Sequence, residues 1–376
     1  MLKMIKYNLK KRSLFILIST IISFAIAFAT YSSDNFLERV YYAQGLYVDG
    51  PSTSPLAFVS TIACILCTII PILEFSFKMK KINIDQMYSL PIKREKLYLA
   101  KYISGLIEIL IPVTIVFIYC VLKVISTNHM YDMIYFLPYF GWLLVLIFVL
   151  YSTITFFYTR ANTIVDGILN IAFIVFLFVI VTASIDEVFL RNIRYRYLTE
   201  ANYFIYSPIN MLTNYFDYKL QQKAILELQQ LYEFEYSYGQ PITINQPRNF
   251  LPIVLFLVIG LGAFVLFIIL NKKEKAENSM QVSNSWFSYR VMIPIYFTSI
   301  SLMFMESGEL ISFIFLFVGV YIAYIIYRRT LKIKKWDMIV IGICFVMAII
   351  VYSVYSSLKP TNPNEIYYAF ELLLKQ

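Results

Sequence analysis

Long apolar runs alternate with short polar stretches along most of the chain. A helix that crosses a bilayer needs about 20 largely apolar residues, and the pattern predicts about nine such spans. The sequence lacks the alternation over about ten residues that is typical of an outer-membrane barrel. We therefore predict an all-α polytopic membrane protein with spans at residues 13–31, 56–75, 102–126, 133–157, 164–183, 250–271, 290–306, 309–327 and 337–357. The seventh run contains Pro294, so we expect it to be tilted, kinked or re-entrant.

The composition and the placement of charge agree with this pattern. Hydrophobic residues make up 60% of the chain and charged residues 15%, which leaves too little polar surface for a soluble fold and makes the lipid bilayer the expected solvent. The net charge of +9 comes from short clusters between apolar runs rather than from one polar domain, so no nucleic-acid partner is expected. Because cytoplasmic loops carry an excess of Lys and Arg, we expect a cytoplasmic N-terminus and an external C-terminus.

Two polar segments are too long to be simple connections. The first is basic and covers residues 77–101, between the second and third predicted spans. The second covers residues 184–249 and lies outside the membrane in the predicted topology. Within it, apolar residues at helical spacing from Met211 predict a helix, and alternation around Gly239 and Pro241 predicts a short strand pair.

Motifs for bond chemistry are absent from the sequence. It contains no P-loop motif and only 11 glycines, and its single histidine, His129, is predicted to lie in a short external turn. Cys64 and Cys67 have the spacing of a redox or zinc motif, but all four cysteines fall inside apolar runs, where thiols usually behave as small buried hydrophobes. We therefore expect no catalytic residue, no metal site and no cofactor bound by this chain itself.

The most informative stretch is KMKKINIDQMYSLPIKREKLYLAKYISGLIEILIP, from Lys78 to Pro112. Residues 80–89 are predicted to form a short helix along the membrane surface, Pro91 ends it, and a basic helix starts at Lys93 and continues into the third span. This elbow would present five residues to a partner protein beneath the membrane: Asp85, Gln86, Met87, Tyr88 and Leu90. The alternative interpretation is a basic loop that only fixes the topology.

The order of a polar helix, then YSLPIKREKLYLAKYISG, then an apolar span resembles the coupling segment of ABC-2 type permeases, the membrane subunits of type V ABC exporters. In that family an amphipathic helix precedes the first span, and MLKMIKYNLKKRS fits this role. The external elaboration between the fifth and sixth spans also agrees. The resemblance covers a six-span core at residues 1–271, whereas residues 272–376 add about three C-terminal spans that the simplest members of the family lack.

This resemblance implies an ABC exporter of a hydrophobic or amphipathic substrate in a bacterial cytoplasmic membrane. Asp85, Gln86, Met87, Tyr88 and Leu90 would contact a separate ABC ATPase subunit, which would bind ATP and Mg. A second permease chain, identical or related, would complete the substrate path. The abundance of Ile, Lys, Asn, Tyr and Phe is typical of an AT-rich genome and is compatible with a bacterial source.

Two acids in or beside predicted spans, Glu74 and Glu108, are candidate functional residues. A bare carboxylate in hydrocarbon is costly, so each should face a partner, water or a cavity. We expect them to pair with basic residues near the inner surface, such as Lys78 or residues of the N-terminal helix, as structural locks. A direct role in binding substrate or protons is the alternative.

Other functions also fit parts of the sequence. The external segment suits a permease that senses, or confers resistance to, antimicrobial peptides. A polytopic membrane transferase would need clustered acid–base or metal-binding residues, for which this sequence offers little. A secondary transporter would typically show inverted repeats and broken helices, and neither is evident in the sequence.

Overall fold

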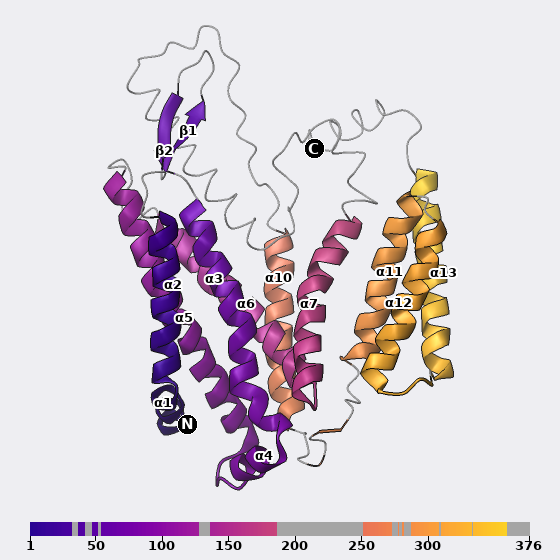
Figure 1. Cartoon of the computed structure of the whole chain (residues 1–376), viewed down its shortest axis with the longest axis horizontal. Helices are drawn as coiled ribbons and strands as arrows, with labels where there is room; N and C mark the ends of the chain where they lie inside the picture. The colour runs from indigo at the N-terminus through magenta and orange to yellow at the C-terminus, as the bar shows by residue number, and fades with distance from the viewer. Residues whose placement is uncertain are drawn as a thin grey trace. The chain divides into compact units, whose positions relative to one another are not determined.

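The computed structural model describes residues 1–31, 37–41, 47–51, 54–127, 136–185, 251–272, 277, 280–281, 287–307, 310–332 and 334–358. Every predicted span coincides with a helix, and the ends agree to within about one turn, except that α5 starts eight residues before the third predicted span. These helices are α2 (Ser13–Tyr31), α3 (Ser54–Phe75), α5 (Arg94–Thr127), α6 (Leu137–Thr159), α7 (Ile164–Ile185), α10 (Leu251–Lys272), α11 (Tyr289–Ser307), α12 (Leu310–Arg328) and α13 (Lys335–Leu358) (Figure 1).

Six of these helices, namely α2, α3, α5, α6, α12 and α13, are long and apolar enough over their described residues to cross a membrane. The apolar parts of α7, α10 and α11 are shorter by the same measure. Pro294 lies inside α11, which nevertheless continues on both sides of it. The fold class is therefore that of an all-α polytopic membrane protein, as the sequence predicts.

The smaller elements lie at the ends of the bundle. The predicted N-terminal helix is α1 (Leu2–Lys11), and a short helix, α4 (Lys81–Tyr88), lies at the same end (Figure 1). A hairpin of β1 (Leu37–Tyr41) and β2 (Tyr47–Pro51) pairs antiparallel, with Leu37 opposite Pro51. The sequence pattern did not predict this hairpin, and the helix and strand pair predicted after Met211 lie outside the described residues.

The described residues divide into two compact units. Unit 1 contains α1 to α6, the start of α7 and α10, whereas unit 2 contains α7 from Ala172 onward together with α11, α12 and α13. The sequence suggests a boundary after residue 271, whereas the last change of unit along the chain follows Gln281. The later part of α7, however, groups with the C-terminal helices.

Unit 1 is built by helices that pack at very short distances. On α10, a Cβ atom added at Gly260 would lie 2.9 Å from the backbone Cα of Val149 on α6. Small residues at such positions let membrane helices approach closely. Large aromatic residues fill the rest of the interior, and Tyr98, Tyr139, Tyr151 and Phe267 are among the largest fully buried side chains.

Unit 2 has its own core around α11. Tyr289, Ile293 and Phe297 of α11 pack with Tyr324 and Tyr327 of α12 and with Ile341 of α13. At one end, Arg328 of α12 forms an ion pair with Asp337 of α13. The outward faces of both units are rich in exposed aliphatic and aromatic side chains, as expected where lipid is the solvent.

Gly260 and Gly262 offer a matched test of the contact between α10 and α6. Gly260→Ala should lower the free energy of unfolding by about 1–3 kcal/mol, because the added methyl group meets backbone that cannot yield. Gly262→Ala lies two residues away on the same helix, meets nothing within 4 Å, and should be neutral or slightly stabilising. Thermal unfolding in detergent measures both, and equal melting temperatures for the two variants would contradict this packing.

Candidate functional site: an elbow above a buried ion-pair cluster

The elbow forms where the chain turns between α3 and α5. After α3 ends at Phe75, a 3-10 turn, η2 (Ser76–Met79), leads into α4. The chain turns again around Pro91 and enters α5 at Arg94. The predicted short helix at residues 80–89 and the predicted restart at Lys93 are therefore confirmed to within one residue.

One face of α4 is open to the surroundings. Asp85 and Gln86 are exposed, Leu90 is 41% exposed, and Met87 and Tyr88 are half-buried. Ile82, which the sequence analysis did not single out, is 74% exposed and lies three to four residues before Asp85 and Gln86, on the same face of the helix. We call Ile82, Asp85, Gln86 and Leu90 the elbow surface.

The opposite face of α4 is anchored to α5. Ile84 is buried, and the Tyr88 hydroxyl shares a 3.0 Å hydrogen bond with the Tyr98 hydroxyl. The Arg94 guanidinium lies 4.5 Å from the centroid of the Tyr88 ring, a cation–π contact. Tyr88, which the sequence analysis placed among the partner-contacting residues, therefore also holds the elbow to its own chain.

Tyr98 is the centre of an aromatic cluster behind the elbow. Its ring stacks on Phe75 at 6.2 Å between centroids and contacts Phe77 at 5.9 Å and Phe267 at 6.1 Å. These rings come from α3, η2 and α10, respectively. Because aromatic pairs in such geometries add to the energy of burial, the cluster gives the elbow a stiff connection to the bundle.

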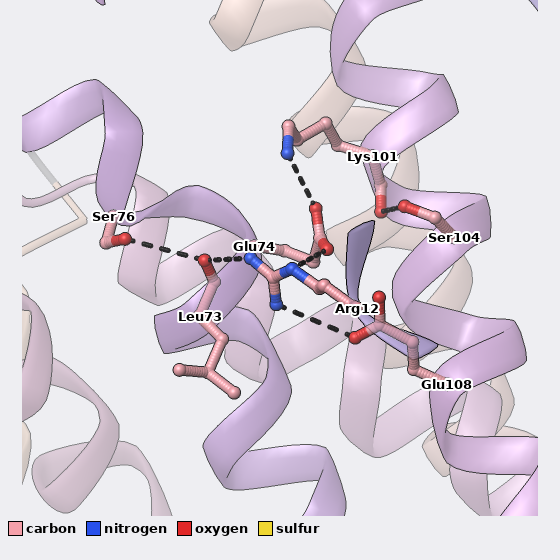
Figure 2. A network of polar contacts seen from close by, with 7 residues as sticks. All are labelled: Arg12, Leu73, Glu74, Ser76, Lys101, Ser104 and Glu108. Atoms are coloured by element: carbon pink, nitrogen blue, oxygen red, sulfur yellow. Dashed lines mark hydrogen bonds and ion pairs between the residues drawn. The ribbon is translucent and has the colours of Figure 1, made fainter. Parts of the chain in front are cut away.

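A cluster of four charged residues lies beside α5, farther from the elbow than Tyr98. Arg12 occupies the junction of α1 and α2, and its Nε lies 2.9 Å from Glu74 Oε1 while its Nη1 lies 3.6 Å from Glu108 Oε2. Its Nη2 donates to the backbone oxygen of Leu73. Lys101 Nζ lies 3.0 Å from Glu74 Oε2. Figure 2 shows both carboxylates beside the single guanidinium.

The formal charges of this ion-pair cluster, made of Arg12, Glu74, Lys101 and Glu108, cancel. Both glutamate side chains are fully buried, whereas the Arg12 side chain is 21% exposed. Buried ions are tolerated only when they are paired, so the cluster fixes the start of α2, the end of α3 and the middle of α5 relative to one another. No bond chemistry follows from this arrangement.

Glu108 is the least satisfied member of the cluster. Among the described residues neither of its oxygens has a hydrogen-bond partner, and the Arg12 guanidinium lies 3.6 Å away, an ion-pair contact rather than a hydrogen bond. The Tyr151 hydroxyl, fully buried and also without a hydrogen-bond partner in the described part of the chain, lies against Gly105, one turn from Glu108. The Tyr151 hydroxyl of α6, a buried donor, thus lies about one turn of α5 away from the buried Glu108 carboxylate.

The pairing agrees only in part with what the sequence suggests: Arg12, at the end of the N-terminal helix, pairs with both acids, as expected of that helix, but Lys78 does not. Lys78, named there as a possible partner of the acids, donates instead to the backbone oxygen of Thr159 at the end of α6. Arg160 donates to Asn271 Oδ1 at 2.6 Å and so joins α6 to α10 at the same end. Lysine at a helix C-terminus satisfies a carbonyl that has no partner within the helix.

The sequence points to the N-terminal helix as a source of partners for the acids but does not single out Arg12, and it gives Lys101 no role. One signal for Lys101 is its spacing, because it lies seven residues, or about two turns, before Glu108 and therefore on the same face of α5. Arg12 is the last basic residue before an apolar span. No local signal links it to Glu74, which lies more than 60 residues away.

Searches with protein-family models, among curated proteins and among solved structures found no match to this chain. Within the described ranges no group of three or more His, Cys, Asp or Glu side chains is placed to hold a metal ion. The fold and the site together define a multi-pass helical membrane protein of a transporter-like kind, with an anchored elbow at the end of the bundle where Arg12 also lies.

Replacing Arg12 tests the ion-pair cluster. Arg12→Ala should lower the free energy of unfolding by about 3–5 kcal/mol, because it leaves a buried carboxylate without its cation. Arg12→Lys should recover only part of this, since a point charge cannot reach both carboxylates and the Leu73 carbonyl at once. Denaturant unfolding in detergent measures the effect.

Two further variants control this experiment. Lys11→Ala removes an adjacent, exposed charge and should change stability little. Adding Glu108→Gln to Arg12→Ala should cost less than the sum of the single changes, because the neutral amide no longer needs the missing cation. Strict additivity would show that Arg12 and Glu108 do not interact.

Proposed function

We propose that this chain is a permease subunit of an ABC exporter, in which the elbow receives movement from a separate ATPase subunit. The observation that carries the proposal is that α4 has an open face and an anchored face. A helix whose outer side is available and whose inner side is fixed by Tyr88, Arg94 and Ile84 is suited to seat in a groove of a partner. The resemblance of residues 78–112 to ABC-2 coupling segments supports the same assignment.

The contacts behind the elbow support transmission of force. Movement of α4 acts on Tyr98 through the shared hydroxyl bond, and Tyr98 belongs to the continuous helix α5. Ten residues farther along this helix, a distance of about 15 Å, lies Glu108 in the ion-pair cluster. Displacement of α5 would therefore change the geometry between Arg12 and Glu108, the longest contact in the cluster.

This role requires an ATPase subunit, a second permease chain and a substrate. The partner ATPase binds ATP and Mg, since the P-loop motif that holds them is not found in this sequence. A second permease chain, identical or related, frames the path with this one in a bacterial cytoplasmic membrane. The substrate is hydrophobic or amphipathic, in keeping with the apolar surfaces of the helices.

Isolation of the chain from its native membrane is the direct test of the class. We expect a P-loop ATPase to copurify with it in mild detergent, and crosslinks from Asp85→Cys to map to that ATPase. Recovery of the intact chain with no nucleotide-binding partner, together with crosslinks from position 85 to lipid alone, would remove the exporter assignment.

The elbow surface can be tested with neighbouring substitutions. Ile82→Ser should release most of the copurifying ATPase, because it removes the most exposed apolar side chain of α4 from a partner's groove. Lys81→Ser changes the adjacent exposed residue and should retain the ATPase. Equal retention by both variants would favour the alternative in which this segment is only a basic loop that fixes topology.

Tyr88→Phe separates docking from transmission. The variant keeps the ring under Arg94 but removes the hydroxyl that bonds to Tyr98, so the ATPase should still copurify. We expect the change in ATPase rate that the permease imposes on its partner to be reduced several-fold, about what the loss of one net hydrogen bond of roughly 1 kcal/mol produces. An unchanged rate would exclude a role for this bond in coupling.

A further inference from the structure

Positive charge is concentrated in the connection between α12 and α13 in unit 2. From Arg328 to Asp337 the sequence holds five cationic residues and one carboxylate. Asp337 is the only carboxylate at this end of unit 2 among its described residues, and it is already paired with Arg328. The exposed side chains of Lys332, Lys334 and Lys335 are thus left without an acidic partner in the described part of unit 2.

The backbone of this connection is fixed at three points. Directly after α12, Arg329 adopts a left-handed conformation with φ 54°, which ends the helix in a sharp turn. The Tyr321 hydroxyl of α12 donates to the Leu331 backbone oxygen at 3.4 Å, which ties the connection to the side of that helix. At the start of α13, the Asp337 backbone N–H donates to the Lys334 backbone oxygen at 3.0 Å. The lysines are therefore presented from a defined turn.

Two exposed apolar side chains flank the lysines. Leu331 and Trp336 are each 75% exposed. Tryptophan rings prefer the headgroup level of a bilayer, where one end of the ring is apolar and the other is wet. A surface that combines ammonium groups with apolar side chains matches an amphiphile, because a soluble anion would use only the charges.

The place of the connection along the chain puts these residues at the headgroup level. Both α12 and α13 are long and apolar enough to cross a membrane. Near the connection, Ile326 of α12 and Met338 of α13 are 55% and 62% exposed, as expected of side chains that face lipid. The lysines therefore lie where the hydrocarbon ends and the phosphates begin. The charge pattern predicts this end to be cytoplasmic, the side on which anionic lipids give a membrane its negative surface potential.

We propose that Leu331, Lys332, Lys334, Lys335 and Trp336, which we call the connection surface, bind the headgroup of an anionic phospholipid. The ammonium groups bind its phosphate, which in an anionic lipid has no choline to compete with them, and the two apolar side chains contact the glycerol and the first methylene groups. A segment that only fixed the topology would need the charges but neither the fixed turn nor the apolar pair. The site is independent of the elbow and of the proposed exporter function.

Quenching of tryptophan fluorescence by brominated lipids tests this surface in the full-length protein reconstituted in bilayers. The sequence has three tryptophans, so Trp142→Phe and Trp286→Phe leave Trp336 as the only reporter. Bilayers of phosphatidylcholine with increasing fractions of brominated phosphatidylglycerol measure which lipid lies beside it. We expect phosphatidylglycerol to be preferred about tenfold over phosphatidylcholine at low salt, because basic residues beside a span attract anionic lipid.

The three lysines are substituted together in this reporter protein. Lys332→Gln, Lys334→Gln and Lys335→Gln combined should bring the preference to within about twofold of equality, because the charge that selects the lipid is gone. The matched control is Lys332→Arg, Lys334→Arg and Lys335→Arg, which keeps the charge and should keep the preference. Brominated phosphatidylcholine alone should quench all of these proteins equally, which shows that the tryptophan has kept its place.

A salt titration of the reporter protein with its lysines intact gives a second measurement that does not depend on the lysine variants. The preference for phosphatidylglycerol should fall as ionic strength rises, because the lysines are exposed and salt screens them. A preference that neither salt nor the glutamine substitutions reduce would overturn the proposal. So would equal quenching by both lipids at low salt, which would leave the lysines a role in topology alone. A Trp336 that no brominated lipid quenches would assign the connection surface to contact with protein or water instead.

Discussion

The structure depends on the requirement that charge buried in a low-dielectric interior be neutralised. Four ionisable side chains meet in unit 1, and their carboxylates are fully excluded from solvent. Such a cluster adds little net stability compared with apolar residues of similar size, but removing one member is costly. The consequence is geometric rather than energetic: the junction of α1 and α2, the end of α3 and the middle of α5 can coexist only in arrangements that keep Arg12 beside both glutamates.

This constraint determines where a movement of the elbow would change the structure. Helix α5 continues without interruption for 34 residues, so the segment that contacts α4 and the segment that carries Glu108 move together. Pro112 lies beyond both of them on the same helix. The aromatic cluster at Tyr98 resists bending near the elbow, while the 3.6 Å contact of Glu108 with Arg12 is the part of the network that is easiest to change. The stiff connection from the elbow along α5 therefore ends at the longest contact of the ion-pair cluster, the one between Arg12 and Glu108.

The sequence predicts well whatever is encoded locally. Apolar runs locate the helices, and Pro91 locates the end of α4, because span length and proline chemistry act within a few residues. The pairing of Glu74 and Glu108 with Arg12 depends instead on the register of three helices, which no local pattern specifies. The sequence places Lys78 and the N-terminal helix near the acids, and only tertiary packing directs Lys78 to the Thr159 carbonyl. The β1–β2 hairpin was missed although its pairing is local, because its two five-residue strands carry no strict alternation of apolar and polar residues.

The two units also differ in how far apart in sequence their stabilising contacts lie. In unit 1 the bond between Arg160 and Asn271 joins residues separated by 111 positions, and the close approach of Gly260 to Val149 has the same range. In unit 2 the ion pair of Arg328 with Asp337 closes a short connection between consecutive helices, and the core around α11 is formed largely by α11, α12 and α13 in order. Local contacts cost less loop-closure entropy and form sooner. The packing of α10 against α6 must therefore wait for distant parts of the chain to meet, whereas the three C-terminal helices can acquire most of their core as they are made.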